Sequence, residues 1–201
     1  MHEKKVIEKT RFLRFCSRLF SVPKWNSAEM RTILDLSLLN KFIENPSFKM
    51  LTLTQVRLLL PPGAWTISLD LENGFWHLAV AKSFRPFLGF SYRGQNWRFK
   101  AMPFGLNLAS RIFTKIISFV VNRLSLEGIW CLPYLDDLLI IATSEECLLK
   151  LQKSLEVIQT LGWIINMEKS RLVPQQAFEW LGVDYELRSF TVKNTTRMCL
   201  K

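Results

Sequence analysis

Histidine and cysteine are scarce in this sequence, which limits the kinds of site it can build. The 201 residues include two histidines, His2 and His77, and four cysteines that lie far apart without any Cys-x-x-Cys pair. This pattern argues against a zinc site and against a disulfide framework, and it fits an intracellular protein. Any catalysis by this chain is therefore expected to depend on carboxylates.

Long apolar runs are also missing, and no secretory leader is expected. No apolar run reaches the length of about 18 residues that a membrane-spanning helix needs. The segment MHEKKVIEKTRFLRF at the N-terminus is basic and has no continuous apolar stretch, so it does not resemble a signal peptide. We expect no membrane partner and an intracellular location, with nucleus and cytoplasm both open.

Apolar residues and positive charge are abundant instead. Hydrophobic residues make up 49% of the chain and charged residues 22%, a balance typical of a globular domain. Lys and Arg number 27 against 17 Asp and Glu, which gives a formal net charge of +10. Such an excess indicates a polyanionic partner, with nucleic acid as the first candidate and an anionic membrane surface as the second.

Local patterns predict a mixture of helices and strands. We expect a basic helix over residues 1–22, a short helix ending at Pro61, and long helices over 108–128 and 144–162. Ser144 is the expected N-cap of the last helix. The buried faces of the two long helices are expected to contain Ile112, Phe113, Ile116, Val120 and Leu124 in one, and Leu148, Leu151, Leu155 and Ile158 in the other.

Strands are expected between these helices. A hairpin is predicted to turn at Arg93-Gly94-Gln95, and a strand over 65–71 is expected to end near Asp70. Strands followed by helices, with hairpins among them, predict an α+β fold in which helices back an antiparallel sheet.

The stretch LPYLDDLLIIAT, residues 132–143, places Asp136 and Asp137 between two apolar strands. Asp favours turns because its side chain bonds to nearby backbone, so a simple turn is one interpretation. A buried carboxylate is costly unless it is paired, neutralised or bound to a metal, so a functional site is the other.

Asp70 repeats this situation at the end of another apolar strand. Alone it is equally compatible with a strand-end turn or cap. A hairpin, a helix and a strand separate the two strand-end acidic sites in the sequence, and the two sites can still lie side by side in one sheet. Three carboxylates that converge in this way repel one another unless a divalent cation neutralises them. Mg²⁺ prefers carboxylate and water oxygens, and two such ions about 4 Å apart promote phosphoryl transfer.

Seven ordered motifs extend this interpretation to a family. They are SRLFSVPK, RTILDLSLLN, SLDLENGFWHL, MPFGLNLASRIFTK, LPYLDDLLI, LGWIINMEKS and FEWLGV. In this order and spacing the chain resembles the reverse transcriptase domain of retroelements over roughly residues 17–192, and most closely that of DIRS-type retrotransposons.

The resemblance implies the chemistry of the acidic residues. Asp70 and Asp136 would be the main ligands of two Mg²⁺ ions, with Mn²⁺ as a possible substitute, and the backbone carbonyl of Leu71 would be a further ligand. Asp137 would contact the metal or the primer terminus, or shape the turn. Lys169 would protonate the leaving pyrophosphate; as an isolated residue it is also compatible with a solvated turn.

Other residues are implied to hold the nucleotide. Lys24 and Arg31 match residues that grip the triphosphate, although either alone is compatible with surface charge. Phe75 matches the aromatic gate that excludes a ribose 2′-hydroxyl, which favours a DNA-making enzyme over an RNA replicase; a core role is its alternative. Phe104 and Gly105 would lie beside the incoming base and template.

A primer grip is implied near the end of the chain. Its residues would be Phe178, Trp180, Leu181 and Gly182, and both aromatic rings are alternatively explained as core. Partners would be an RNA or DNA template with primer, together with dNTPs.

The resemblance also implies a division of the chain into subdomains. A single domain over 1–201 would comprise fingers (1–63 and 78–105), a palm (64–77 and 106–192) and a short tail (193–201). A thumb is expected to be absent, with a thumb, RNase H or recombinase domain belonging to a longer parent protein. The alternative to a polymerase is a non-catalytic retroelement remnant that binds nucleic acid or protein.

Overall fold

The computed structural model describes residues 5–23, 30–142, 146–189 and 191–194. The chain divides into two compact units, each described by itself below. Unit 1 comprises Met1–Phe48 and Asn73–Phe113, and unit 2 comprises Lys49–Glu72 and Thr114–Lys201. The assignment of fingers and palm to particular residues stays a prediction.

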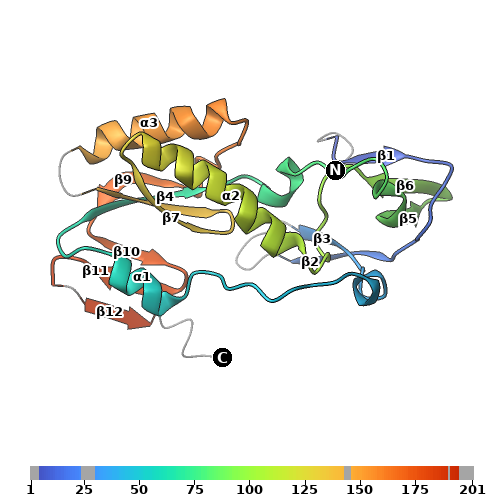
Figure 1. Ribbon diagram of the computed structural model, residues 1–201, viewed down its shortest axis with the longest axis horizontal. Coiled ribbons are helices and arrows are strands. Elements are labelled where there is room, and N and C mark those ends of the chain that lie inside the picture. Colours follow the sequence, from blue (N-terminus) through green and yellow to red (C-terminus); the bar gives the residue numbers. More distant parts are fainter. Residues whose placement is uncertain (1–4, 24–29, 143–145, 190, 195–201) are drawn as a thin grey trace. The chain divides into compact units, whose positions relative to one another are not determined.

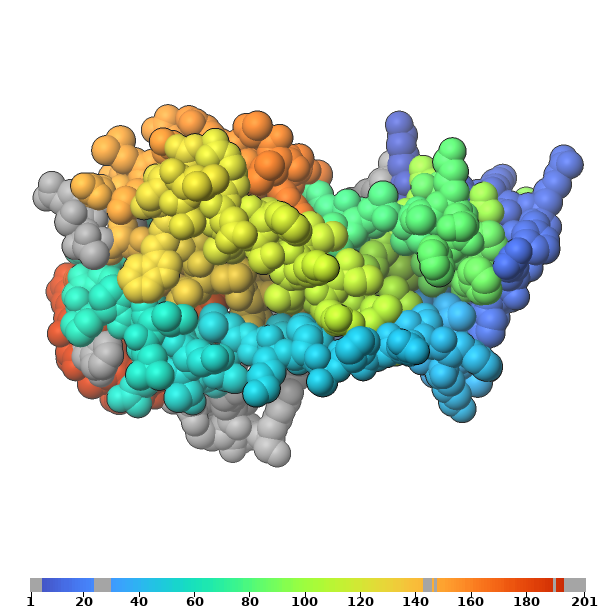
Figure 2. Space-filling model, in the orientation of Figure 1, coloured from blue at the N-terminus to red at the C-terminus, as the bar shows by residue number. Residues whose placement is uncertain are grey.

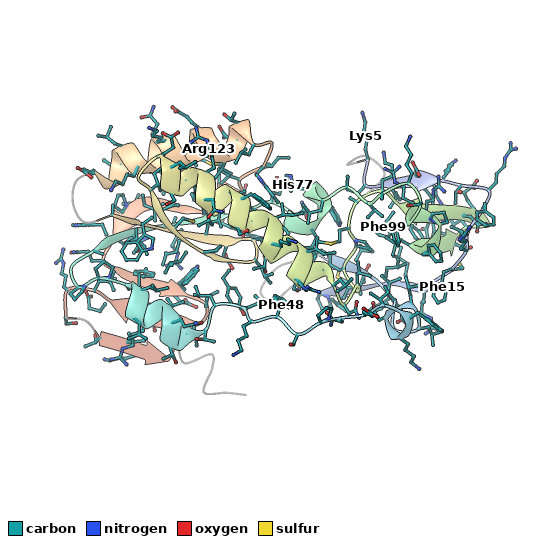
Figure 3. The ribbon with its side chains drawn as sticks, viewed as in Figure 1. Lys5, Phe15, Phe48, His77, Phe99 and Arg123 are labelled. Carbon is teal, nitrogen blue, oxygen red and sulfur yellow. The ribbon has the colours of Figure 1, made fainter. Side chains whose placement is uncertain are left out.

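Unit 1 is built on a three-stranded antiparallel sheet with the order β1-β6-β5. Its strands are β1 (Ile7–Lys9), β5 (Gly89–Tyr92) and β6 (Gln95–Phe99). Phe99, which is 1% exposed, packs with Phe90 and Leu34 in the core of this unit (Figure 3). In Figure 2 the blue residues near the N-terminus lie against the green residues of the β5–β6 region. The expected hairpin is confirmed, with Arg93 and Gly94 at its turn.

The remaining elements of unit 1 are short. They are a second hairpin, formed by β2 and β3, and three 3₁₀ turns. Their bounds are β2 (Leu19–Pro23), β3 (Met30–Leu34), η1 (Leu39–Phe42), η2 (Gly74–His77) and η3 (Arg85–Phe87).

The prediction of a helix over residues 1–22 is wrong. The described residues of this segment contain β1 and β2 instead, and Thr10–Phe15 is an irregular connection. Helical spacing of Phe12, Phe15 and Leu19 was the basis of that prediction. Strand pairing overrides it, because Ile7 and Lys9 complete the ladder opposite Phe99 and Trp97.

Unit 2 contains the central four-stranded antiparallel sheet, with the order β7-β8-β4-β9. Its strands are β4 (Trp65–Asp70), β7 (Trp130–Tyr134), β8 (Asp137–Ala142) and β9 (Arg171–Gln175). Residues 138–142 of β8 are all buried, which explains why both faces of this strand are apolar.

Further elements lie on the two faces of this sheet (Figure 1). Helix α3 packs against β4, β8 and β9. On the other face Leu139 and Ile141 share a core cluster with Val56, Phe178 and Tyr185. The bounds are α1 (Leu53–Leu59), α2 (Ala109–Leu126), α3 (Cys147–Thr160), β10 (Ala177–Trp180), β11 (Val183–Glu186) and β12 (Thr191–Asn194). The expected α+β class is therefore confirmed.

The long helices are confirmed, but their buried faces differ in detail from those expected. In α2, Ile117 is buried, whereas Ile112 is exposed. In α3, Ser154 is fully buried and Leu148 is 60% exposed. The Ser154 hydroxyl donates to the Lys150 carbonyl at 2.6 Å, which satisfies it without a core partner.

The expected cap Ser144 lies outside the described residues, and Glu146 occupies the N-cap of α3.

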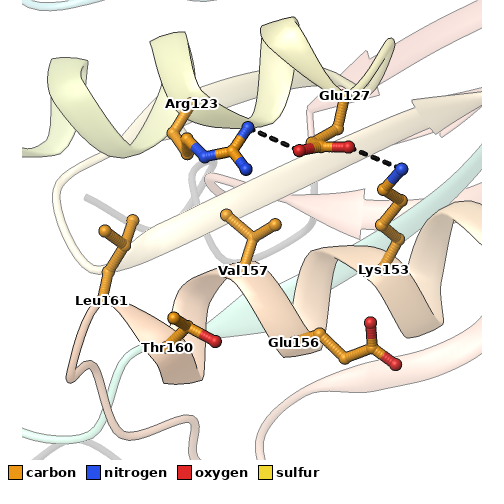
Figure 4. A pocket seen from close by; sticks show the side chains of 7 residues that line it. All are labelled: Arg123, Glu127, Lys153, Glu156, Val157, Thr160 and Leu161. Carbon is orange, nitrogen blue, oxygen red and sulfur yellow. Dashed lines mark ion pairs between the residues drawn. The ribbon is translucent and has the colours of Figure 1, made fainter.

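Ion pairs connect α3 to the end of α2. The Glu127 carboxylate accepts from Arg123 and from Lys153, each at 2.5 Å, at the edge of a pocket of about 240 Å³ (Figure 4). These partners lower the pKa of Glu127, with the Lys153 hydrogen bond as the largest cause. In the described ranges, none of the helices is both long and apolar enough to traverse a membrane.

Candidate active site

The turn between β7 and β8 is a two-residue hairpin loop. Tyr134 pairs with Asp137 in the ladder, so Leu135 and Asp136 form the loop itself. Leu135 has φ of 51°, a left-handed conformation that costs an ordinary side chain about 1 kcal/mol or more. A strained leucine between Tyr134 and two aspartates is a feature that the surrounding structure must maintain, and such strain concentrates at functional sites.

Asp70 lies beside this turn. Strand β4 pairs with β8 so that Asp70 is directly opposite Asp137, and the Leu71 amide donates to the Asp136 carbonyl at 2.8 Å. Directly opposite residues have Cβ atoms about 5 Å apart on the same face of the sheet. The expectation that the two strand-end acidic sites lie side by side in one sheet is confirmed.

Electrostatic repulsion is strong at this end of the sheet. Burial, together with the negative charges of Asp136 and Asp70, raises the pKa of Asp137 from 3.8 to about 7, and the Lys169 ammonium opposes this shift in part. The carboxylates therefore interact with one another, and Lys169 is close enough to interact with Asp137. Such a site favours the binding of a cation.

The loop before β9 holds Asp70 through backbone hydrogen bonds. The Asn166 amide donates to the Asp70 carbonyl at 2.8 Å, and the Asp70 amide donates to the Ser170 hydroxyl at 3.0 Å. That hydroxyl donates in turn to the Asn166 carbonyl at 2.7 Å. The ring of bonds holds the segment 166–170, which includes Lys169, against the backbone of Asp70.

The roles of Asn166 and Ser170 were not predicted from the sequence. Both lie in the motif LGWIINMEKS, in which a role was expected for the lysine alone. Asn and Ser favour loops in which a side chain forms a hydrogen bond to the backbone. This preference is the only feature of the sequence that indicates a structural role for these two residues.

The side chains at this end of the sheet do not form a complete metal-binding cluster by themselves. No group of three or more His, Cys, Asp or Glu side chains within the described ranges is arranged to hold one. The donor chemistry nevertheless fits Mg²⁺, because Asp70 and Asp136–Asp137 supply carboxylates at one sheet end and Mg²⁺ commonly completes its shell with water and substrate phosphate.

Three of the expected nucleotide-binding residues meet within unit 1. The Phe75 ring lies 5.0 Å from the Phe104 ring and 5.3 Å from the Phe113 ring, measured between centroids. The Arg31 guanidinium lies over Phe104 at 5.2 Å. Phe75 is only half-buried, so its packing does not enclose it fully. Lys24 lies outside the described residues.

Gly105 joins the same group through its backbone. Its φ is 112°, and a Cβ added there would collide with the carbonyl oxygen of Leu34. The adjacent Leu34 amide donates to the Phe104 carbonyl at 3.0 Å, and the Asn40 side chain donates to the Gly105 carbonyl at 2.9 Å. Only glycine allows this close approach of two backbone segments.

The expected primer-grip residues have two different environments in unit 2. Phe178 and Trp180 are buried, and Phe178 stacks on Tyr185 at 5.2 Å between ring centroids. Leu181 and Gly182 form the two-residue turn between β10 and β11, with φ of 53° and 76°. The two aromatic rings therefore stabilise the core beneath the turn, against which Leu181 also packs, and a contact of these residues with a primer stays a prediction.

Comparison with known proteins agrees with this geometry. Residues 17–185 match the family model described as reverse transcriptase (RNA-dependent DNA polymerase). Protein P of heron hepatitis B virus is 28% identical over 191 residues, covering 90% of this chain and 24% of that protein. The genome polyprotein of petunia vein clearing virus is 24% identical over 164 residues, covering 81% of this chain and 7% of that protein.

Solved structures show the same fold. The foamy viral protease-reverse transcriptase in complex with double-stranded DNA matches 98% of this chain with a TM-score of 0.84 and 21% identity, over 33% of its own length. The same type of protein in complex with an RNA/DNA hybrid matches 96% of the chain with a TM-score of 0.79. The chain thus spans from under a tenth to about a third of the length of these proteins.

Proposed function

Since the chain belongs to the reverse transcriptase (RNA-dependent DNA polymerase) family, we propose that it catalyses template-directed DNA synthesis at the end of the β7–β8 hairpin. The observation that carries this proposal is the direct pairing of Asp70 with Asp137 beside Asp136 in the turn. Two of the three carboxylates lie on paired strands and the third lies in the turn, and their mutual repulsion favours a divalent cation that could bind a substrate phosphate.

Two Mg²⁺ ions, or Mn²⁺ in their place, would be held by Asp70 and Asp136, with Asp137 and the carbonyl of Leu71 as further ligands. When bound, such ions activate an attacking hydroxyl and neutralise charge on the leaving oxygen. The primer 3′-oxygen would bond to the α-phosphorus of a dNTP while the bond from that phosphorus to the pyrophosphate oxygen breaks. Lys169, placed by the loop that bonds to Asp70, would give a proton to the departing pyrophosphate.

Residues of unit 1 would select the nucleotide. Arg31 and Lys24 would bind the triphosphate, since Arg offers two parallel donors to phosphate and Lys offers a point charge. The half-buried ring of Phe75 would exclude a 2′-hydroxyl, and Phe104 and Gly105 would lie beside the base. Phe75→Ala is therefore expected to incorporate ribonucleotides that the native chain rejects, and equal discrimination against ribonucleotides by both chains would contradict this role.

The substrate proposed is an RNA or DNA template with a primer. Two observations support this substrate. The chain has a formal net charge of +10, and the foamy viral protease-reverse transcriptase, which has a similar fold, has been solved in complex with double-stranded DNA and with an RNA/DNA hybrid. The turn at Leu181–Gly182 would contact the primer. A DIRS-type origin, and further domains in a longer parent protein, stay predictions.

Primer extension on an RNA template tests the proposal. The native chain is compared, with Mg²⁺ and dNTPs, to the double variant Asp136→Asn, Asp137→Asn and to Asp184→Asn, which removes an exposed carboxylate of the same unit. Extension by the native chain and by Asp184→Asn, but not by the double variant, supports polymerisation at this site. Absence of extension in all three, with salt-sensitive nucleic-acid binding retained, favours the non-catalytic binding module instead.

A further inference from the structure

Asn40 is the last residue of the motif RTILDLSLLN, in which the proposed function uses only Arg31. It lies in the 3₁₀ turn η1, where its backbone amide donates to the Leu36 carbonyl at 2.7 Å. Its side chain is half-buried and reaches the backbone of residues that lie 65 and 67 positions further along the chain. These residues are Gly105 and Asn107, and we refer to 104–107 as the PFG loop.

The side-chain amide of Asn40 bonds to the PFG loop at two points within unit 1. Its Nδ2 donates to the Gly105 carbonyl at 2.9 Å, and its Oδ1 accepts from the Asn107 backbone amide at 3.1 Å. Only one orientation of the side chain satisfies both groups, because a carbonyl needs a donor and an N–H group needs an acceptor. Two bonds from one planar group fix the orientation of the loop as well as its distance from η1.

The PFG loop carries Phe104, against which Phe75 packs. The two ring centroids are 5.0 Å apart, and the Arg31 guanidinium lies over the Phe104 ring at 5.2 Å. Leu34 holds the other end of the loop, since its amide donates to the Phe104 carbonyl at 3.0 Å. Phe75 is half-buried and takes part of its packing from Phe104. A shift of the loop would therefore move the surface on which the Phe75 ring rests.

We propose that Asn40 is a positioning residue that sets how strictly Phe75 excludes a ribose 2′-hydroxyl. This inference rests on the proposed function, because it concerns the choice between dNTP and rNTP at the same site. A misplacement of about 1 Å can cost an enzyme about 100-fold in rate. Loss of the two bonds from a half-buried side chain loosens the loop without removing Phe75, so a smaller effect of about tenfold is expected.

Primer extension by a single nucleotide, opposite a template adenine, tests the proposal. The full chain is supplied with dUTP or with UTP, which differ only in the 2′-hydroxyl, and the ratio of kcat/KM for dUTP to that for UTP is measured. Asn40→Ala is expected to lower this ratio about tenfold, because a ring without fixed support yields to the added hydroxyl. A variant that is only less folded loses both activities in proportion, so the ratio does not report stability.

Two further variants serve as controls of this experiment. Asn45→Ala removes an exposed asparagine of the same unit and is expected to keep the native ratio. Asn40→Asp keeps the size of the side chain and the acceptor for Asn107, but it turns a carboxylate toward the Gly105 carbonyl. It is expected to lower the ratio as Asn40→Ala does, and it replaces that variant if circular dichroism melting shows Asn40→Ala to be unfolded.

The dependence on Phe75 is tested by removing its ring. In the Phe75→Ala background, Asn40→Ala is expected to leave the ratio of dUTP to UTP use unchanged, because the group that Asn40 positions is gone. Urea midpoints of the two single variants and the double variant give a second readout that needs no nucleotide. Residues coupled through a shared loop lose a different amount together than the sum of their separate losses, whereas Asn45→Ala and Phe75→Ala should be additive.

Three results would overturn the proposal. They are a native ratio in both Asn40 variants, an equal change of the ratio with and without the Phe75 ring, and additive urea midpoints for Asn40→Ala and Phe75→Ala. Failure of the proposed function gives a different result, in which the native chain incorporates neither nucleotide. In that case the urea midpoints still decide whether Asn40 positions Phe75.

Discussion

Replacing Asp137 by Asn should make the metal-free protein more stable while removing its activity. Burial and the charges of Asp136 and Asp70 raise the pKa of Asp137 from 3.8 to about 7. Each pKa unit corresponds to about 1.4 kcal/mol, so ionised Asp137 destabilises the folded chain by up to about 4 kcal/mol. Asn keeps the shape of the side chain without its charge, and the gain in unfolding free energy is expected to be a sizeable part of that amount.

The gain has a defined pH dependence. Below pH 3.8 the carboxyl is protonated in both states and contributes nothing. Between 3.8 and about 7 the folded chain keeps a proton that the unfolded chain has lost, so native stability falls as pH rises and then levels off. The advantage of Asp137→Asn should therefore grow through this interval and be constant above it.

Urea denaturation in EDTA at about pH 5 and about pH 8 measures this gain. The control Asp184→Asn, an exposed carboxylate of the same unit, should stay within about 0.5 kcal/mol of native. Adding Mg²⁺ should narrow the gap, because the cation stabilises the native carboxylates more than the variant. An Asp137→Asn chain less stable than native at about pH 8 would refute the electrostatic reasoning.

Three further predictions concern other positions. Gly105→Ala should lower the urea midpoint strongly, by about 3 kcal/mol, because its Cβ meets backbone at a φ of 112°; Gly94→Ala, with open space around it, should cost only the strain of about 1 kcal/mol. Ser170→Ala removes the acceptor of the Asp70 amide and should cost about 1–3 kcal/mol and slow primer extension, whereas Ser170→Thr should retain both. Burial opposes ionisation of Glu8, but hydrogen bonds and attraction from two arginines outweigh it and lower its pKa below 4.5. Its stabilisation should be present above pH 4.5 and lost as pH falls through the lowered pKa, and acid titration of Glu8→Gln followed by circular dichroism should lack that loss.

Periodicity and turn chemistry predicted the elements whose local signals agree with their packing. The β5–β6 hairpin, the two long helices and the strands around Asp136 were all expected from apolar spacing and from glycine or proline at their ends. The prediction failed at residues 1–22, where helical spacing competed with strand pairing that local sequence does not reveal. It also misplaced part of two helix faces, since Ile117 and Ser154 are buried by neighbours distant in the sequence.

The sequence by itself therefore determined the secondary structure of most of the chain, the identity of the acidic residues and the family resemblance. Only the tertiary structure decided that Asp70 lies opposite Asp137, and that the ring of hydrogen bonds through Ser170 holds it there. Only the folded chain brings the side chain of Asn40 to the backbone of Gly105 and Asn107. The physical reason is that strand register and long-range hydrogen bonds join residues about 70 to 100 positions apart, whereas propensity and periodicity act over a few residues.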